Sequence, residues 1–167
     1  MLRIRTPGAA RGPGNAAGKH WAALVAASVF TILVLTYRPA LAADSLSPGA
    51  GKVVLVDFWA SWCEPCRHSF PWMNDMQKKY AHDGLVIVAV NVDNDRAAAR
   101  RFLDENPTEL EIRYDDDRSL ARRFEVVAMP SSFLLDEHGE VVERHLGFKV
   151  LKQDEYEAAI KAALGKE

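Results

Sequence analysis

The two cysteines of the chain, Cys63 and Cys66, lie between a segment of strand composition and a segment of helical periodicity. The residues before them, 53–56, form an apolar, β-branched run of the length of a buried strand. From Arg67 to about Tyr80, apolar side chains recur at steps of three and four, which predicts a helix. The sequence therefore places the cysteine pair where a buried strand passes into the first turn of a helix.

This position favours a reactive thiol. The first turn of a helix has unpaired N–H groups and the positive end of the helix dipole, so a thiolate at Cys63 is expected to have a lowered pKa. Cys66, one turn later, is placed to attack the mixed disulfide that Cys63 forms. Pro65 is tolerated in a first helical turn. Glu64 adds a negative charge that raises the thiolate pKa again, which favours a reducing or moderate dithiol over a strongly oxidising one.

Three other uses of a cysteine pair remain as alternatives. A structural zinc site usually needs two ligand pairs, and the chain has no further cysteine and no histidines at the spacing of a zinc finger. A purely structural disulfide would close a loop too short to stabilise the fold much. A copper chaperone would use Cys63, Cys66 and His68, because soft Cu(I) binds thiolates. No metal site is predicted, and the redox interpretation is favoured over all three.

The first 42 residues have the composition of an export segment. Residues 21–37 are uncharged and mostly apolar, and a small-residue site ends at Ala42. The charged residues around the apolar stretch are all basic: Arg3, Arg5, Arg11, Lys19 and Arg38. This layout predicts either a signal peptide cleaved after Ala42 or a retained membrane anchor at 21–37. Both would export residues 43–167, in a bacterial cell to the oxidising periplasm.

The rest of the chain is expected to contain one domain, residues 52–167, after a polar linker at 43–51. The whole chain has a net charge of −2 and residues 1–42 carry +5, so the remainder carries −7. A mildly acidic domain is not attracted electrostatically to nucleic acid or to an anionic membrane. We therefore expect no nucleic-acid partner.

Strands and helices alternate along this domain. Strands are expected at 52–59, 85–92, 109–114, 131–136 and 140–148, and helices at 67–80, 93–106, 118–124 and 152–164. A β-α-β start implies a parallel, right-handed crossover, and the late hairpin adds antiparallel strands. The predicted fold class is α/β, with a central mixed sheet flanked by helices.

Asp57 is a carboxylate within the apolar run of the first strand. Burial of a carboxylate is costly and raises its pKa. Two interpretations are open: an acid at a strand end that faces water, and a buried proton acceptor beneath the cysteines that assists Cys66. The second is favoured.

Several motifs together resemble a known family. Residues 53–66, followed later by Met129-Pro130, are similar to the thioredoxin superfamily, and about 46–165 resembles the exported TlpA/ResA/DsbE-like thiol–disulfide oxidoreductases. Further matching pieces are Gly51-Lys52, Arg67, Pro71, Gly84-Leu85, Asn91-Val92-Asp93, Ser131-Ser132-Phe133 and Asp136-x-x-Gly139.

The resemblance implies a thioredoxin fold and a set of residue roles. Cys63 would be the exposed attacking thiol and Cys66 the resolving thiol, with Pro130 as a cis-proline beside the pair. A substrate groove would be formed by Trp62, Glu64, Pro65 and Met129.

The chain departs from the family at one acid. Many relatives have a glutamate three residues after the second cysteine, where this chain has Ser69. Asp57 instead matches the buried aspartate of thioredoxin. The resemblance therefore implies that the proton-transfer acid has moved to the strand.

The function expected on these grounds is the reduction of disulfides in oxidised periplasmic proteins, with electrons received from a membrane-embedded thiol donor. Cytochrome c maturation and copper-site assembly are the family roles considered. No bound cofactor is expected, because the Cys63–Cys66 dithiol is itself the redox group. The alternatives are a disulfide-forming oxidant and the periplasmic copper chaperone.

Overall fold

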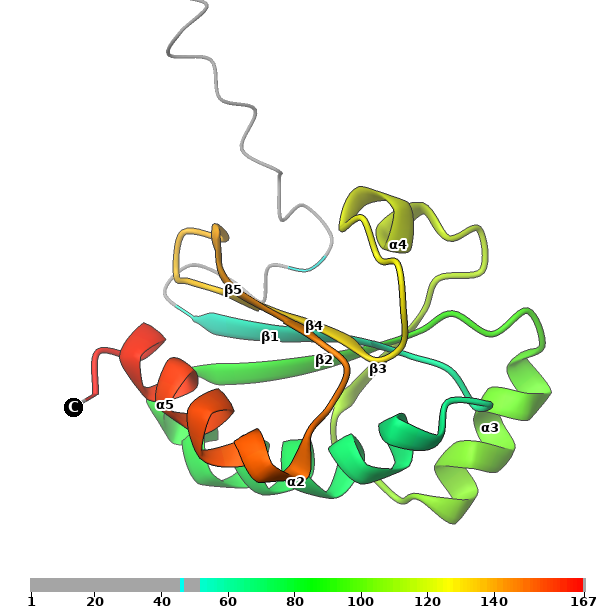
Figure 1. Ribbon diagram of the computed structural model, residues 1–167, viewed down its shortest axis with the longest axis horizontal. Coiled ribbons are helices and arrows are strands. Elements are labelled where there is room, and N and C mark those ends of the chain that lie inside the picture. Colours follow the sequence, from blue (N-terminus) through cyan, green and yellow to red (C-terminus); the bar gives the residue numbers. More distant parts are fainter. Residues whose placement is uncertain (1–45, 47–51, 167) are drawn as a thin grey trace, which may run out of the picture. The chain divides into compact units, whose positions relative to one another are not determined.

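A single mixed β-sheet forms the centre of the computed structural model, which describes residue 46 and residues 52–166 (Figure 1). The strands are β1 (Val53–Trp59), β2 (Leu85–Asn91), β3 (Glu111–Tyr114), β4 (Ser131–Leu135) and β5 (Val141–Leu146). Their order is β3-β2-β1-β4-β5. β1 and β2 are parallel, as are β2 and β3, whereas β4 is antiparallel to both β1 and β5. The predicted α/β fold with a mixed sheet is confirmed.

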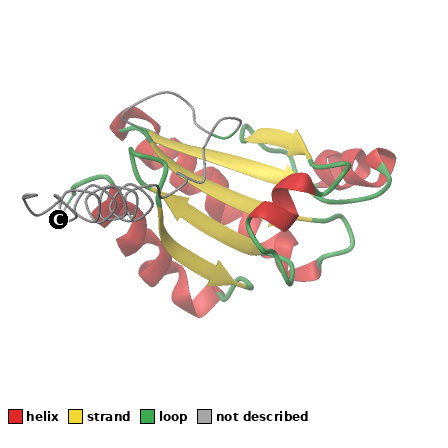
Figure 2. Ribbon diagram, turned by 90° about the horizontal axis from the view of Figure 1, so that it is seen from above, coloured by secondary structure: helices red, strands yellow, loops and turns green. Residues whose placement is uncertain are grey.

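Helices cover both faces of this sheet. They are α2 (Glu64–Tyr80), α3 (Arg96–Glu105), α4 (Ser119–Arg123) and α5 (Gln153–Ala163), with 3-10 turns η1 (Ala81–Asp83) and η2 (Val150–Lys152). In Figure 1, α2, α3 and α5 lie below the sheet and α4 lies above it. Figure 2, seen from the α4 side, shows the twist of the strands.

The core follows from the alternation of side chains along β1, all seven residues of which are buried. Phe58 packs on the α4 side, with its ring centroid 5.5 Å from that of Phe124. Trp59 points to the other side, 5.0 Å from Phe70 of α2 and 4.7 Å from Phe102 of α3. β1 is therefore enclosed on both faces, as its almost unbroken apolar sequence predicts.

Each predicted strand and helix of the domain is present, and the differences lie at element ends. α2 begins at Glu64 and not at Arg67, so Cys66 lies inside the helix. The strand predicted to reach residue 148 ends at Leu146, because Gly147 has a φ of +74° and turns the chain away from β4.

The N-terminal predictions fall almost entirely outside the described residues. This applies to the signal or anchor at 1–42 and to all of the linker at 43–51 except Leu46, which is buried in the core. Within residue 46 and residues 52–166, no helix combines the length and the apolar character that a membrane span requires.

Candidate active site

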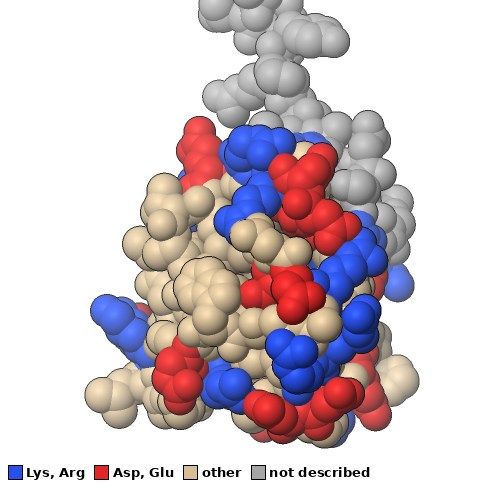
Figure 3. Space-filling model, turned by 90° about the vertical axis from the view of Figure 1, so that its right-hand side faces the viewer, with Lys and Arg blue, Asp and Glu red and all other residues tan. Residues whose placement is uncertain are grey.

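β1 leads into α2 on the side of the molecule that Figure 3 faces, where uncharged surface lies beside acidic and basic groups. Three of the four predicted groove residues, Trp62, Glu64 and Pro65, are exposed, and Met129 is half-buried. Trp62 is 69% exposed, which is unusual for a tryptophan that has an apolar core nearby. An exposed aromatic side chain next to a buried cysteine pair offers a contact surface for another chain.

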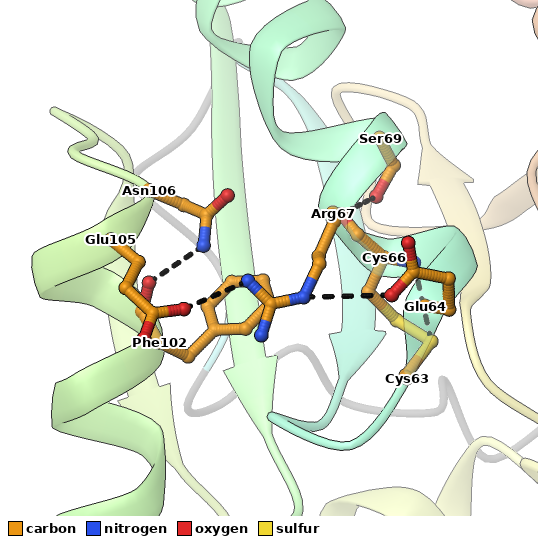
Figure 4. A network of polar contacts seen from close by, with 8 residues as sticks. All are labelled: Cys63, Glu64, Cys66, Arg67, Ser69, Phe102, Glu105 and Asn106. Carbon is orange, nitrogen blue, oxygen red and sulfur yellow. Dashed lines mark hydrogen bonds and ion pairs between the residues drawn. A yellow bond between two sulfur atoms is a disulfide. The ribbon is translucent and has the colours of Figure 1, made fainter.

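The two cysteines form a disulfide across the first turn of α2, with a Cα–Cα distance of 5.3 Å. Cys63 is the N-cap residue, and its Sγ accepts a hydrogen bond of 3.3 Å from the backbone N–H of Cys66 (Figure 4). A thiolate at Cys63 would lie at the positive end of the helix dipole and accept the same hydrogen bond. The placement predicted from the sequence is thus observed.

The exposure predicted for Cys63 is wrong for the disulfide form. Cys63 is only 3% exposed, and Cys66 is at 0%. The reason is that the Sγ of Cys63 turns onto the first turn of α2, where it meets both the N–H and the Sγ of Cys66. Cys63 is still the more accessible member of the pair, so a partner would approach it first.

Pro130 lies at the same end of the sheet as the cysteine loop. The Met129–Pro130 peptide bond is cis, as the family resemblance implies. The next residue, Ser131, pairs with Phe58 near the end of β1, and Pro130 itself is buried. Its carbonyl accepts a hydrogen bond of 2.8 Å from the N–H of Gly147, which joins the end of β5 to this loop.

Arg67 compensates the charge of Glu64. Its Nε lies 3.6 Å from Oε2 of Glu64, its Nη1 lies 3.0 Å from Oε2 of Glu105, and its guanidinium lies 5.0 Å from the ring centre of Phe102 (Figure 4). In the sequence alone, Glu64 stands as a negative charge without a partner. With a cation beside it, Glu64 raises the pKa of a Cys63 thiol less than an unpaired carboxylate would, so the preference for a reductant is weaker.

Asp57 is buried in the middle of the sheet at 1% exposure, so the interpretation as a strand-end acid facing water is wrong. Burial raises the pKa of its carboxyl from 3.8 to about 7, opposed by a hydrogen bond of 2.6 Å that the Ser132 hydroxyl donates to Oδ1. The other oxygen, Oδ2, has no hydrogen-bond partner among the described residues. A carboxyl that titrates near neutral pH is suited to accepting and releasing a proton.

Two other carboxylates, Asp93 and Asp115, are buried in the described part of the chain, and both are fully engaged. Asp115 accepts hydrogen bonds from the N–H groups of Leu120 and Ala121 and so caps α4, as expected for acids before that helix. Ser69, at the family's glutamate position, is buried and donates to the carbonyl of Cys66 at 3.0 Å. Of these three buried carboxylates in the described residues, Asp57 is thus the one with an oxygen that accepts no hydrogen bond.

Asp93 holds the loop that precedes Cys63. Its Oδ2 accepts from the backbone N–H of Ser61 at 2.9 Å, and its Oδ1 accepts from the Ser61 hydroxyl at 3.0 Å. Asn91 donates a further hydrogen bond of 2.8 Å to Oδ2. In the sequence, Asn91-Val92-Asp93 is a family match without an assigned role. The available signal is a polar pair at the end of a buried strand, one residue in β2 and one just after it, at the same end of the sheet as the cysteines.

No group of three or more potential metal ligands comes together within residue 46 and residues 52–166. His68, an optional third ligand in the copper-chaperone alternative, is exposed. The two cysteine sulfurs are bonded to one another in this structure.

Comparison with known proteins gives concordant results. The Redoxin family model matches residues 38–160. The thiol-disulfide oxidoreductase ResA of Bacillus cereus is 32% identical over 103 residues, which are 62% of this chain and 60% of that protein. The thioredoxin-like protein YneN of Bacillus subtilis is 36% identical over 115 residues, 67% of this chain and 66% of that protein.

Among solved structures, a Chlorobium tepidum protein assigned as a thiol:disulfide interchange protein DsbE superposes with a TM-score of 0.70 at 47% identity. The match covers 72% of this chain and 85% of that chain. These similarities confirm the resemblance to TlpA/ResA/DsbE-like proteins and the thioredoxin-like fold. The chain spans about 60% of the length of the ResA relatives that it matches.

Proposed function

The chain belongs to the Redoxin family, and from this premise we propose that it is an exported thiol–disulfide oxidoreductase that reduces disulfides in other proteins. The observation that carries the proposal is the cysteine pair at the N-terminus of α2, with Cys63 as the N-cap residue. The names of the ResA and DsbE relatives, which describe thiol–disulfide chemistry, support it.

The reaction proceeds by two exchanges of sulfur bonds. The Cys63 thiolate attacks a disulfide of the target, forms a mixed disulfide and releases one target sulfur as a thiolate. Cys66 then loses its proton to the Asp57 carboxylate, and its thiolate attacks the Cys63 sulfur. The second target sulfur leaves as a thiolate, and both target thiolates take protons from solvent. Two electrons have passed to the target, and the Cys63–Cys66 disulfide remains.

A thiol donor must then reduce that disulfide by the reverse sequence of exchanges. We infer a membrane-embedded donor and oxidised periplasmic protein targets, in keeping with the export segment predicted at 1–42. Cytochrome c maturation and copper-site assembly are the processes to examine first. The dithiol is the redox group in this scheme, so no bound cofactor takes part.

The reduction potential of the Cys63–Cys66 pair is the deciding measurement. The full chain is equilibrated with defined ratios of reduced and oxidised dithiothreitol, and the fraction of free thiol is determined. A value near that of thioredoxin, about −270 mV, is expected for a reductant. A value near about −120 mV would make the protein a donor of disulfides instead.

The oxidant alternative has one specific observation behind it, the ion pair between Arg67 and Glu64. A compensated Glu64 opposes the thiolate less, and a stabilised thiolate makes a dithiol more oxidising. The same titration separates the two functions.

A further inference from the structure

Three polar residues form one row across three neighbouring strands. Asp57 of β1 pairs with Ser132 of β4, and Ser132 pairs with His145 of β5. Cross-strand partners point to the same face of a sheet. The row therefore runs from the centre of the sheet to its β5 edge, beneath the face that α2 and α5 cover.

Asp57, at the inner end of this row, has no direct contact with bulk solvent, although the proposed reaction requires it to exchange protons. Asp57 is almost completely buried, its Oδ1 accepts the Ser132 hydroxyl, and Oδ2 is unpartnered among the described residues. In the proposed reaction Asp57 takes a proton from Cys66 in every turnover. A target bound over Cys63 would close the approach past the disulfide, so the proton needs another way out.

A small cavity lies between the middle and the outer end of the row. It has a volume of about 10 Å³ and is lined by Ser132 and His145, with Trp72, Tyr156 and Ile160 among its apolar and aromatic walls. This is the least space that admits one water molecule, and the hydroxyl and the imidazole provide the two polar partners that a buried water requires at minimum.

His145 lines this cavity and also reaches the protein surface, where it is half-buried. His145 and Tyr156 also line a surface depression of about 350 Å³ between β5 and α5. The imidazole is half-buried, packs 4.4 Å from the ring centre of Tyr156, and has its Nδ1 3.9 Å from Oε1 of Glu143. One side chain thus faces the cavity on one side and a carboxylate and open solvent on the other.

We propose that Ser132, one water molecule in the cavity and His145 form a proton relay between Asp57 and the solvent at the β5–α5 surface. This inference rests on the proposed function, because it supplies the proton path for the Cys66 step. Once Asp57 holds the proton, the Ser132 hydroxyl rotates from Oδ1 towards the water. The Asp57 acid then passes its proton to the Ser132 oxygen while the Ser132 hydroxyl proton passes to the water. The water gives a proton to His145, and the imidazolium releases one to solvent. One proton enters and one leaves, and no electrons move.

The charges around His145 suit this role. Burial lowers the pKa of the imidazole, so that it is mostly neutral at pH 7 and can accept a proton. Glu143 of the same strand and Glu155 of α5 raise the pKa, whereas Lys152 of η2 lowers it. From the helices, Trp72 of α2 lines the same cavity and Tyr156 of α5 packs on the imidazole.

The test is the rate at which the reduced full chain reduces a model protein disulfide, measured in single turnovers from pH 5 to 9. In His145→Ala, which leaves room for a free imidazole, we expect a rate about tenfold or more below wild type in dilute buffer. We expect the rate to rise with added imidazole and to acquire a solvent isotope effect. His138→Ala, on the exposed β4–β5 turn, is the matched control and should keep the wild-type rate without a response to imidazole.

A purely structural role of His145 would give a slow variant that imidazole does not restore, and that result overturns the relay. A wild-type rate in His145→Ala at every pH overturns it as well. If the alanine variant does not fold, His145→Gln takes its place, and wild-type kinetics there would equally reject the relay. Failure of the proposed function appears differently, as an unmodified chain that does not reduce the substrate at all.

Discussion

Ser61 and Asp93, 32 positions apart in the chain, are joined by two hydrogen bonds, one from the backbone N–H of Ser61 and one from its hydroxyl. The carboxylate follows β2, and the serine lies in the loop between β1 and α2. The contact therefore connects the end of one central strand to the loop that places Cys63. It holds the loop at Ser61, before the cysteines, whereas the disulfide constrains only Cys63 and Cys66.

Asp93→Ala should change both stability and redox behaviour. It leaves the Ser61 N–H without its acceptor, and the loss of a charged, buried acceptor is expected to cost about 2–3 kcal/mol in the free energy of unfolding. Because the loop before Cys63 loses its support, the reduction potential should shift as well. Asp95→Ala is the matched control: it removes the N-cap of α3, costs about 1 kcal/mol and should leave the potential unchanged. Urea unfolding and dithiothreitol equilibration measure the two quantities.

Asp57 should make the protein less stable as the pH rises towards neutrality. Below its ordinary pKa of 3.8 the carboxyl is protonated in both the folded and the unfolded chain. Between 3.8 and about 7 the unfolded chain loses this proton while the folded chain keeps it, so stability falls over that window. The full loss is on the order of 4 kcal/mol. It is complete above the folded pKa.

Asp57→Asn removes this titration, because the amide stays neutral at every pH. The variant should be more stable than wild type at pH 8 and should show a flatter stability profile between pH 4 and 7 in urea unfolding. Resolution of the mixed disulfide should be slower. Asp104→Asn, at an exposed position on α3, should retain the wild-type pH dependence, and identical profiles for both variants would contradict the burial argument.

Serine variants of the two cysteines should differ in whether a mixed disulfide with a target accumulates. Cys66→Ser leaves the attacking thiol in place but removes the one that resolves the adduct, so a mixed disulfide with a target should accumulate. Cys63→Ser should form almost none. Non-reducing electrophoresis and mass spectrometry detect the adduct, and its release by dithiothreitol confirms the bond. Accumulation in Cys63→Ser alone would reverse the assigned roles.

Glu64 and Arg67 should tune the reduction potential in opposite directions. Glu64→Gln removes a negative charge near the Cys63 thiolate and should raise the potential, whereas Arg67→Gln leaves Glu64 unopposed and should lower it. Exposed pairs contribute at most about 1 kcal/mol, so each shift should be no more than about 20 mV. The double variant should lie close to wild type in the dithiothreitol equilibrium.

Local patterns were sufficient to predict the strands, the helices and the cysteine pair at the start of α2, because each depends on residues close together in the chain. The rest depends on pairing across the sheet. Ser132 meets Asp57 from 75 positions away, and the row to His145 follows from the register of two antiparallel ladders. The cis bond before Pro130 came from family resemblance alone, since most bonds before proline are trans.

The burial of Cys63 could not be predicted from the sequence either. The family resemblance implies an exposed attacking thiol, but the disulfide and the hydrogen bond from the N–H of Cys66 hold that sulfur against the first turn of α2. Arg67 was noted as part of a motif, whereas its contacts with Glu105 and Phe102 depend on where α3 lies beside α2. Such contacts between elements are set by packing and have no local signature.

The central position of β1 has a consequence for the partners of this protein. All seven of its residues are buried and it is paired on both edges, so its amide hydrogens should be among the slowest to exchange with solvent. Cys63 follows this strand after a short loop that Asp93 holds in place. The backbone that carries the Cys63 sulfur is therefore rigid. Cys63 can shift little to meet a target disulfide that is held in an unfavourable position. Under the proposed function, the target has to adapt instead, and we expect targets whose disulfide lies in a segment that is not yet folded or that opens easily.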